Sequence, residues 1–268
     1  MGAFLLKRIS SLFEDIGERF FYLMETSGYT ILLLLECLYY LKNLFSKGRE
    51  IMKHMYVAGV KSLLVCSIVA LFTGMILALQ AGIEFAVYGQ QAMVGNLVIA
   101  SMTREMGPFT TAIILTASVG SSMAAEIGTM KVSEEIDALE MMSISPVKFL
   151  VMPRVVALSI MLPVVSVYTT ALGTLGGGIV ANYQLNVTWD VYYAHVLESL
   201  KFKDTYVGLF KAFVNGVVIS GVSCSEGLRA SNGAMGVGKA TRSSVVTSFL
   251  MVLILGYYIT SIFYGRQM

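Results

Sequence analysis

The most regular feature of the sequence is a series of long apolar runs separated by short polar segments. Five of them approach or exceed the roughly 20 residues that an α-helix needs to cross ~30 Å of hydrocarbon. They cover residues 62–83, 92–125, 149–180, 206–224 and 245–264. The pattern therefore predicts an all-α polytopic membrane protein with five transmembrane helices.

The second run is longer than one straight crossing requires, and it contains a polar interruption. Residues 92–125 would extend for about 50 Å at ~1.5 Å per residue. Arg104-Glu105 and then Gly107-Pro108 interrupt them. We expect a re-entrant or tilted first part, a break near residues 104–108, and a true span from about Phe109.

Two weaker amphipathic segments precede the first long run. Between residues 4 and 21, apolar positions recur at helical spacing with charged residues between them, which is typical of a helix in the bilayer interface. Residues 29–41 form a second apolar run that is too short to span and contains Glu36. We predict N-terminal interfacial helices over residues 1–56, followed by the membrane domain over residues 57–268.

Composition supports a membrane protein and excludes several other classes. Hydrophobic residues make up 56% of the chain and charged residues only 13%, whereas a soluble domain carries roughly 25% charged residues. The apolar excess excludes disorder, and a net charge of +2 is too small for a nucleic-acid binder. Cys37, Cys66 and Cys224 lie far apart without a CxxC motif, which favours reduced, packed cysteines over disulfides.

The distribution of basic residues predicts the orientation of the chain. Of the 19 Lys and Arg residues, 14 lie before the first run, between the second run and the start of the third (Arg154 included), or between the fourth and fifth. The positive-inside rule then places the N-terminus in the cytoplasm and the C-terminus outside.

Small residues repeat along three of the predicted spans, where they let helix backbones approach closely. We expect these stripes to pack within one subunit, although at least one could form a dimer face. The stripes are Ala112, Thr116, Gly120, Ala124 and Gly128; Gly173 and Gly177; and Gly208, Ala212, Gly216 and Ser220.

The segment 233–240 nearly matches the phosphate-binding pattern GxxxxGK[ST]. Ala240 occupies the position of the Mg²⁺-binding hydroxyl, no buried strand precedes the segment, and a span follows at once. A flexible cytoplasmic loop is therefore expected, so any nucleotide must be bound by another chain. His54 and His195 lie far apart without other ligands at metal-binding spacing, and no GxSxG motif is present. We expect neither a cofactor nor a catalytic site.

Arg104 and Glu105 are the most specific local feature, because a charge at bilayer depth costs about 2.5–3.5 kcal/mol on insertion scales. Adjacent helical positions point about 100° apart, so the two side chains should not neutralise each other. Pro108 lacks the N–H that would bond to the Arg104 carbonyl, which leaves this carbonyl free for another donor. A polar site lining a cavity is predicted, with an elbow in the headgroup region as the alternative.

Residues 126–142 form an acidic segment between the second and third runs. Val132, Ile136, Leu139 and Met142 would share one face of a short helix, and acidic residues outnumber basic ones. Such a helix should dock on a protein with a basic and apolar groove. A merely solvated loop is the alternative.

Several ordered motifs resemble the MlaE-type permeases of bacterial lipid-transporting ABC systems, over residues of about 57–263. They are Arg104-Glu105-Met106-Gly107-Pro108, Ala125-Glu126-Ile127-Gly128-Thr129-Met130-Lys131-Val132, Glu135-Ile136-Asp137-Ala138-Leu139, Pro153-Arg154, and Gly236-Val237-Gly238-Lys239-Ala240-Thr241. The resemblance implies a homodimeric permease in the bacterial inner membrane, joined to two ATPase subunits and an extracytoplasmic MCE-domain lipid-binding protein. ATP would be bound by the partner ATPase.

The resemblance also assigns candidate site residues. It makes the segment 126–142 the coupling helix, and it places lipid in a cavity between two subunits. The coupling candidates are Glu126, Gly128, Glu134, Glu135, Asp137 and Glu140. The lipid-site candidates are Leu77, Gln80, Phe85, Tyr88, Arg104, Glu105 and Lys211.

Two positions depart from the family pattern, which usually has arginine at Ser118 and often an acidic residue at Gly256. If these two residues normally pair, their joint absence removes a pair rather than stranding one charge. The sequence thus predicts a permease subunit that moves lipid and has no catalytic residues of its own. A membrane scaffold and an ion-coupled carrier remain the alternatives.

Overall fold

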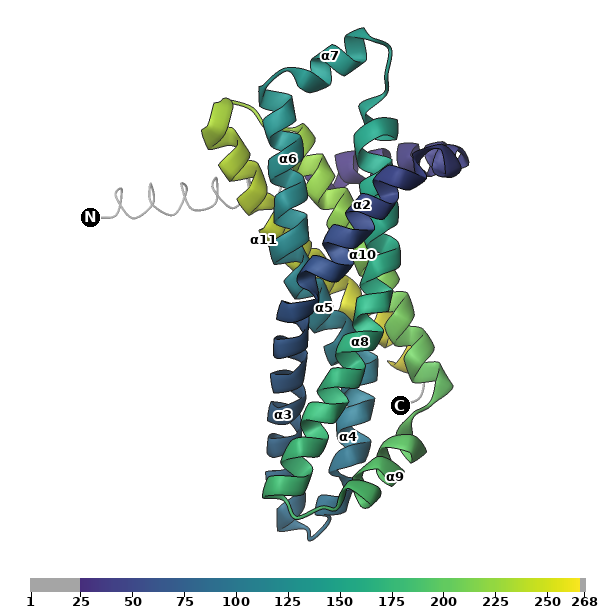
Figure 1. Ribbon diagram of the computed structural model, residues 1–268, viewed down its shortest axis with the longest axis vertical. Coiled ribbons are helices and arrows are strands. Elements are labelled where there is room, and N and C mark those ends of the chain that lie inside the picture. Colours follow the sequence, from purple (N-terminus) through teal and green to yellow (C-terminus); the bar gives the residue numbers. More distant parts are fainter. Residues whose placement is uncertain (1–24, 266–268) are drawn as a thin grey trace, which may run out of the picture.

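The computed structural model describes residues 25–265, and this part of the chain is helical with no strand. Five helical segments in it are long and apolar enough to cross a membrane, which confirms the predicted class and span number (Figure 1). Their bounds are Gly48–Val87, Gln91–Val132, Val147–Gln184, Phe202–Leu228 and Gly233–Tyr264. The predicted amphipathic segment 4–21 lies outside the described residues.

The first, third, fourth and fifth spans are nearly continuous helices. Short 3₁₀ or π turns join the helices within a span, and two short helices, α7 and α9, connect consecutive spans. The elements are α2 (Gly48–Gly59), η2 (Val60–Ser62) and α3 (Leu63–Val87); η6 (Val147–Val151) and α8 (Met152–Gln184); α10 (Phe202–Leu228); α11 (Gly233–Tyr264); α7 (Glu135–Met141); and α9 (Trp189–Ser199).

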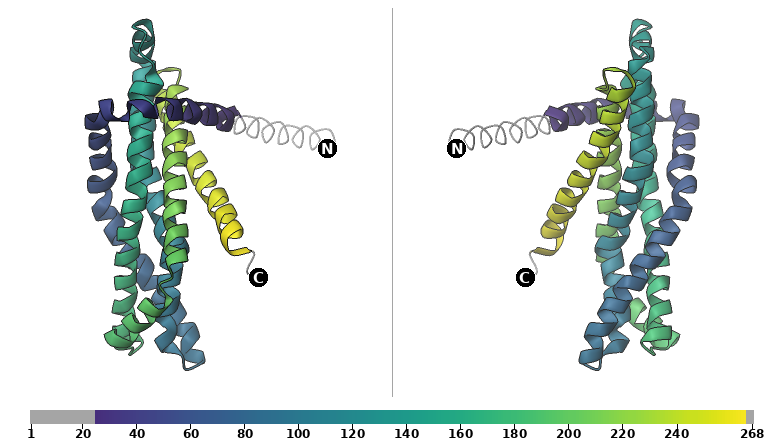
Figure 2. Two further views of the ribbon diagram at one scale, coloured as in Figure 1. Left: turned by 90° about the vertical axis from the view of Figure 1, so that its right-hand side faces the viewer. Right: turned by 90° about the vertical axis from the view of Figure 1, so that its left-hand side faces the viewer.

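Residues before the first span also form helix. Residues 25–40 are α-helical and lead through η1 (Leu41–Lys47) into α2. Figure 2 shows the helix 25–40 running across the bundle near its α7 end. The predicted boundary at residue 56 falls within α2 and stays a prediction.

The second span is a continuous helix, so the predicted break near residues 104–108 is wrong. It consists of η3 (Gln91–Met93), α4 (Val94–Ser101), η4 (Met102–Met106), α5 (Gly107–Leu115), η5 (Thr116–Gly120) and α6 (Ser121–Val132). Both η4 and η5 are π turns, and in η4 the Gly107 N–H donates to the Met102 carbonyl five residues earlier. This wider turn accommodates Pro108 without ending the helix.

All three small-residue stripes are buried inside the single chain, as favoured from the sequence. A Cβ atom on Gly208 would lie 2.2 Å from the Thr103 carbonyl oxygen, and one on Gly216 would lie 2.8 Å from that of Leu158. A Cβ on Gly173 would meet the Met102 side chain at 2.1 Å. These stripes hold neighbouring spans together and are not left exposed for a dimer face.

The glycine-rich segment 233–240 is helical, so the predicted flexible loop is wrong. Asn232 and Gly233 form the turn with φ of 63° and 69°, and α11 begins at Gly233. Gly236 packs against the backbone of Ser231, where an added Cβ would overlap the carbonyl oxygen. Close packing of the first helical turn therefore replaces the open loop that a phosphate would require.

The three cysteines are free and buried, as predicted. Cys37 and Cys224 belong to an apolar cluster with Ile127, Ile136 and Leu150 near the α7 end. Burial raises the pKa of the Cys37 thiol to about 11, which keeps it in the unreactive thiol form at neutral pH.

Replacing Gly74 by alanine should destabilise the bundle. The new Cβ would lie 1.8 Å from the Gly173 carbonyl oxygen, and overpacking costs about 1–3 kcal/mol. Gly256→Ala is the matched control, because nothing lies within 4 Å of its added Cβ. Thermal unfolding of the purified protein in detergent should show a lower midpoint for the first variant only. Equal midpoints would mean that α3 and α8 do not touch at this point.

Candidate functional site

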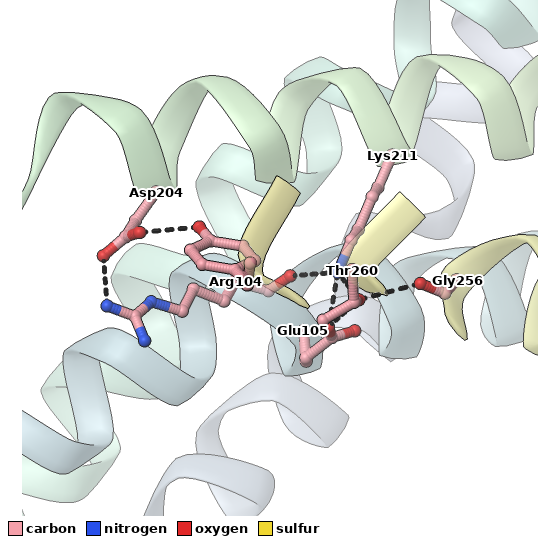
Figure 3. A network of polar contacts seen from close by, with 7 residues as sticks. Arg104, Glu105, Asp204, Lys211, Gly256 and Thr260 are labelled. Atoms are coloured by element: carbon pink, nitrogen blue, oxygen red, sulfur yellow. Dashed lines mark hydrogen bonds and ion pairs between the residues drawn. The ribbon is translucent and has the colours of Figure 1, made fainter. Parts of the chain in front are cut away.

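A cluster of charged side chains joins the second span to α10 and α11 (Figure 3). The Arg104 guanidinium donates to Asp204 at 2.8 Å, and the Tyr264 hydroxyl donates to the other oxygen of Asp204 at 2.6 Å. The guanidinium also lies 5.1 Å from the centre of the Tyr264 ring. The outer end of α11 is thereby bound to both neighbouring helices.

A second set of contacts lies next to the first. Lys211 pairs with Glu105 and donates to Thr260 at 2.7 Å. The Thr260 hydroxyl lies 2.5 Å from Glu105 and 2.8 Å from the Gly256 carbonyl oxygen, either of which can take its proton. Three helices therefore meet around one ammonium group.

The two adjacent charges of the second span do not pair with each other, as predicted. Arg104 turns to Asp204 and Glu105 turns to Lys211 (Figure 3). The Arg104 carbonyl, which Pro108 cannot serve, accepts a hydrogen bond from Lys211 at 3.0 Å. This confirms that the carbonyl takes another donor.

The partners on α10 follow from helical spacing. Asp204, Gly208 and Lys211 lie at i, i+4 and i+7 and share one face. The missing side chain at Gly208 lets this face approach the second span, which brings the two charged groups beside Arg104 and Glu105. The sequence analysis missed Asp204, although its position on the face of Lys211 could have indicated it.

Two charged side chains of this cluster are almost fully buried, so the stability of the protein depends on their pairing. Asp204 is 3% exposed and Lys211 is 2% exposed. At bilayer depth such groups persist only when they are paired, and each here has at least two polar contacts. The arrangement holds helices together, and no free nucleophile or acid–base pair projects from it into a cavity.

Of the seven lipid-site candidates, three on α3 lie together. Leu77, Gln80 and Phe85 of α3 line a cavity of about 490 Å³, closed on one side by Leu97 of α4. Tyr88 lies just past the end of α3, is 75% exposed, and does not line this cavity. The charged cluster around Lys211 is a separate site that shares no residue with it.

The predicted coupling segment is not one helix. Glu126 and Gly128 belong to α6, which ends at Val132, and a turn with Glu134 at φ 59° precedes α7. Glu126 accepts from Arg154 of α8 at 3.1 Å. Gly128 packs against the start of α11, where an added Cβ would lie 3.3 Å from Ala230 and 3.5 Å from Val237. These two residues therefore stabilise the bundle end.

The short helix α7 projects beyond the bundle (Figure 1). Ile136 is 2% exposed and packs into the apolar cluster with Ile127 and Leu150, which anchors the helix. Glu134, Glu135, Asp137 and Glu140 are exposed, and Met141 and Met142 are 89% and 69% exposed. Lys131 donates to Asp137 at 2.6 Å. An acidic surface with apolar side chains is thus presented outward.

The two positions that depart from the family pattern have local partners. The Ser118 hydroxyl is exposed and donates to the Ile114 carbonyl at 2.7 Å. The Gly256 carbonyl accepts from Thr260. The idea that a charged pair was lost jointly at these positions stays a prediction.

Five spans, a charged cluster inside them and a projecting acidic helix describe a multi-pass membrane protein. The sequence matches the family described as Permease MlaE over residues 51–262. The chain belongs to this permease family.

The relatives include permeases from distant organisms. The chain is 39% identical over 214 residues to a probable ABC transporter permease protein of Rickettsia typhi, covering 80% of this chain and 83% of the relative. It is 36% identical to a probable ABC transporter permease protein of Synechocystis, and the match covers 79% of this chain and 81% of the relative. It is 31% identical to the chloroplastic protein TRIGALACTOSYLDIACYLGLYCEROL 1 of Arabidopsis thaliana, and the match covers 81% of this chain and 62% of the relative.

Replacing Lys211 by methionine should destabilise the protein by about 2 kcal/mol, less than the roughly 3–5 kcal/mol of a fully buried pair. The loss is smaller because the Glu105 side chain is 41% exposed. The double variant Lys211→Met/Glu105→Gln should recover most of it, since no charge is then left without a partner. Thermal unfolding in detergent measures both. A double variant no more stable than the single one would show that the ion pair is not the source of the loss.

Proposed function

We propose that this chain is the permease subunit of an ABC-type lipid transporter, in which two copies enclose a path for phospholipid. The observation that carries the proposal is the cavity lined by Leu77, Gln80 and Phe85 at one end of α3. Its volume of about 490 Å³ lies within the ~300–1,000 Å³ typical of small-molecule sites. Most of its lining is apolar and suits an acyl chain, while Gln80 and Glu84 offer polar groups to a headgroup.

A second copy of the chain would complete this cavity. The face of α3 that leads to it is apolar and exposed in one chain, with Leu64 70%, Phe72 56% and Ile83 59% exposed. Lipid as the substrate is also supported by the Arabidopsis relative, whose name is that of a lipid. Tyr88 is placed beyond the cavity, where it would meet lipid on entry or exit.

Energy would enter through α7. The segment 233–240 is packed helix, so it offers no loop around a phosphate. ATP would be bound by a separate ATPase subunit, two copies per dimer, and this chain would carry no cofactor. The exposed Glu135, Asp137 and Glu140 suit a basic groove, while Met141 and Met142 provide the apolar contact.

The opposite end of the bundle would face an MCE-domain lipid-binding protein. The basic residues Lys131, Lys148 and Arg229 lie near the α7 end, so the positive-inside rule makes that end cytoplasmic. The α9 end would then face the extracytoplasmic space, where such a partner lies in a bacterial inner membrane. The complex would pass lipid to or from this partner.

The proposal is tested by purifying the chain with the proteins that accompany it and reconstituting the complex in liposomes. We expect co-purified phospholipid by mass spectrometry and ATP hydrolysis that rises when lipid is supplied. Transport that follows an ion gradient without ATP would indicate a carrier instead. A complex with neither lipid nor lipid-stimulated hydrolysis would indicate a scaffold.

Filling the α3 cavity should slow lipid transfer. Gln80→Trp places a large ring among Leu77, Phe85 and Leu97. We expect a transfer rate lower by roughly tenfold, equivalent to about 1.4 kcal/mol. Val164→Trp on α8 is the control, because Val164 is exposed but does not line the cavity. Fluorescent-phospholipid transfer between liposomes measures both variants. Equal rates would remove this cavity from the transport path.

Reversing two charges on α7 should release the ATPase. The double variant Asp137→Lys/Glu140→Lys places positive charges against the proposed basic groove of the ATPase. Like charges brought together in an interface cost several kcal/mol of binding free energy. Both side chains are exposed, so the five spans should still fold. Asp190→Lys/Glu198→Lys on α9 makes the same charge change at the other end of the bundle and should retain the ATPase. Co-purification stoichiometry decides, and normal retention in the α7 variant would place coupling elsewhere.

A further inference from the structure

A second cavity of about 480 Å³ lies on another side of the bundle, between the second span, α8, α9 and α10. It shares no lining residue with the α3 cavity. Figure 1 shows α9 crossing between the ends of α8 and α10 at the end of the bundle opposite to α7. We call this cavity the α8–α10 groove. Its walls include Thr103, Val167, Ala171, Leu175, Tyr193 and Leu209.

The lining of the groove is apolar in effect, although several residues carry hydroxyls. None of the lining residues is charged. The Thr103 hydroxyl donates to the Ile99 carbonyl at 2.7 Å, and that of Thr174 donates to the Thr170 carbonyl at 2.8 Å. These two hydroxyls are satisfied within their own helices and need no partner from a ligand. The occupant is therefore expected to be a hydrocarbon group.

The groove opens to the outside of the chain along α8. Val167 is 52% exposed and Leu175 is 42% exposed, and both lie in the third membrane span. At this depth the surrounding medium is lipid hydrocarbon rather than water. An acyl chain of a neighbouring lipid is thus the group that meets the opening.

Aromatic side chains gather on α9, and one of them, Tyr193, lines the groove. The Trp189 and Tyr193 rings stack with centroids 5.7 Å apart, and the buried Tyr192 donates to the Thr174 carbonyl at 2.8 Å. Trp and Tyr are typical of the membrane–water interface. A chain lying in the groove would therefore have its headgroup at the level of α9.

We propose that the α8–α10 groove binds one acyl chain of a bilayer phospholipid, at a site separate from the α3 cavity. Its volume is within the range of small-molecule sites. Glu198 at the end of α9 and Lys201 just before α10 are both exposed and carry opposite charges, so the site recognises the chain rather than a particular headgroup. This inference rests on the membrane placement of the chain and not on lipid being its substrate.

The position of the groove connects this bound lipid to the charged cluster. Thr103 lines the groove and precedes Arg104 in the same π turn. Thr170 also lines it and packs against Gly107, where an added Cβ would lie 2.1 Å from the Thr170 hydroxyl. A chain in the groove therefore supports the turn that carries Arg104 and Glu105.

The test uses phosphatidylglycerol with a diazirine at the end of one acyl chain, reconstituted with the full-length protein in liposomes. After irradiation, labelled residues are mapped by mass spectrometry. We expect labels on the α8 segment 167–175 and the α10 segment 205–209, well above those at Val164, an exposed residue of α8 outside the groove. Uniform labelling of all exposed α8 residues would overturn the proposal.

A second experiment fills the groove with a larger side chain. Ala171→Trp should lower groove labelling by about tenfold or more, because excluding even two methylene groups accounts for such a factor. Ala171→Leu should lower it less. Val164→Trp is the control on the same helix and should leave it unchanged. Unchanged labelling in the folded Ala171→Trp protein would refute the site, and the wild-type map decides if this variant does not fold.

Two further readouts separate this site from the proposed transport function. Labels at Leu77 and Phe85 should persist in Ala171→Trp, since the two cavities share no residue. A phosphatidylethanolamine probe with the same chain should label the groove equally, and a strong headgroup preference would contradict recognition of the chain alone. Groove labelling in a protein that transfers no lipid would refute the transport proposal and leave this one standing.

Discussion

Backbone contact at glycine is the interaction on which this bundle depends. Lipid tails are as apolar as leucine, so membrane helices gain little from hydrophobic burial against each other and rely on close packing and hydrogen bonds. At Gly74 and Gly208 the neighbouring backbones, at Gly173 and Thr103, occupy the space that a side chain would need. The contact at Gly208 sets the distance at which Asp204 and Lys211 can reach their partners on the second span. The charged cluster is a consequence of this approach.

The cluster in turn positions α11, which otherwise touches the bundle least at its outer end. Figure 2 shows α11 diverging from the other helices toward the C-terminal end. Tyr257 and Ile262 there are 70% and 72% exposed. Hydroxyl contacts from Thr260 and Tyr264 to the charged groups, together with the ring contact between Phe210 and Phe263, tie this end to α10 and the second span. A polar network therefore holds α11 against its neighbours, as close packing at small residues holds the other helices together.

Much of this architecture could be predicted from the sequence, because hydrocarbon thickness fixes the length of an apolar run. The number of spans and the divergence of Arg104 and Glu105 followed from length and from helical geometry alone. Asp204 was not predicted, because it lies before the apolar run of its helix and a charged residue at such a position is typical of a loop. The partition of residues 126–142 was missed because burying Ile136 requires a turn at Glu134, which depends on the cluster around Ile127 and Leu150. The α3 cavity could be assigned only by resemblance, since no spacing rule indicates which exposed face is hollow.

The π turn at Thr116–Gly120 has a geometric consequence for the stripe of small residues along the second span. On an ideal α-helix, steps of four residues drift by about 40° each, so four steps would carry Gly128 about 160° around the axis from Ala112. Yet both residues, and every stripe member between them, are buried in the same chain. A π turn holds more residues per turn than an α-helix, so it rotates the stripe backwards within its own length. One locally widened turn thus corrects the angular position of the stripe around the helix axis. Deleting a single residue from this turn would rotate every later side chain of α6 away from its partner, including the Glu126 that meets Arg154.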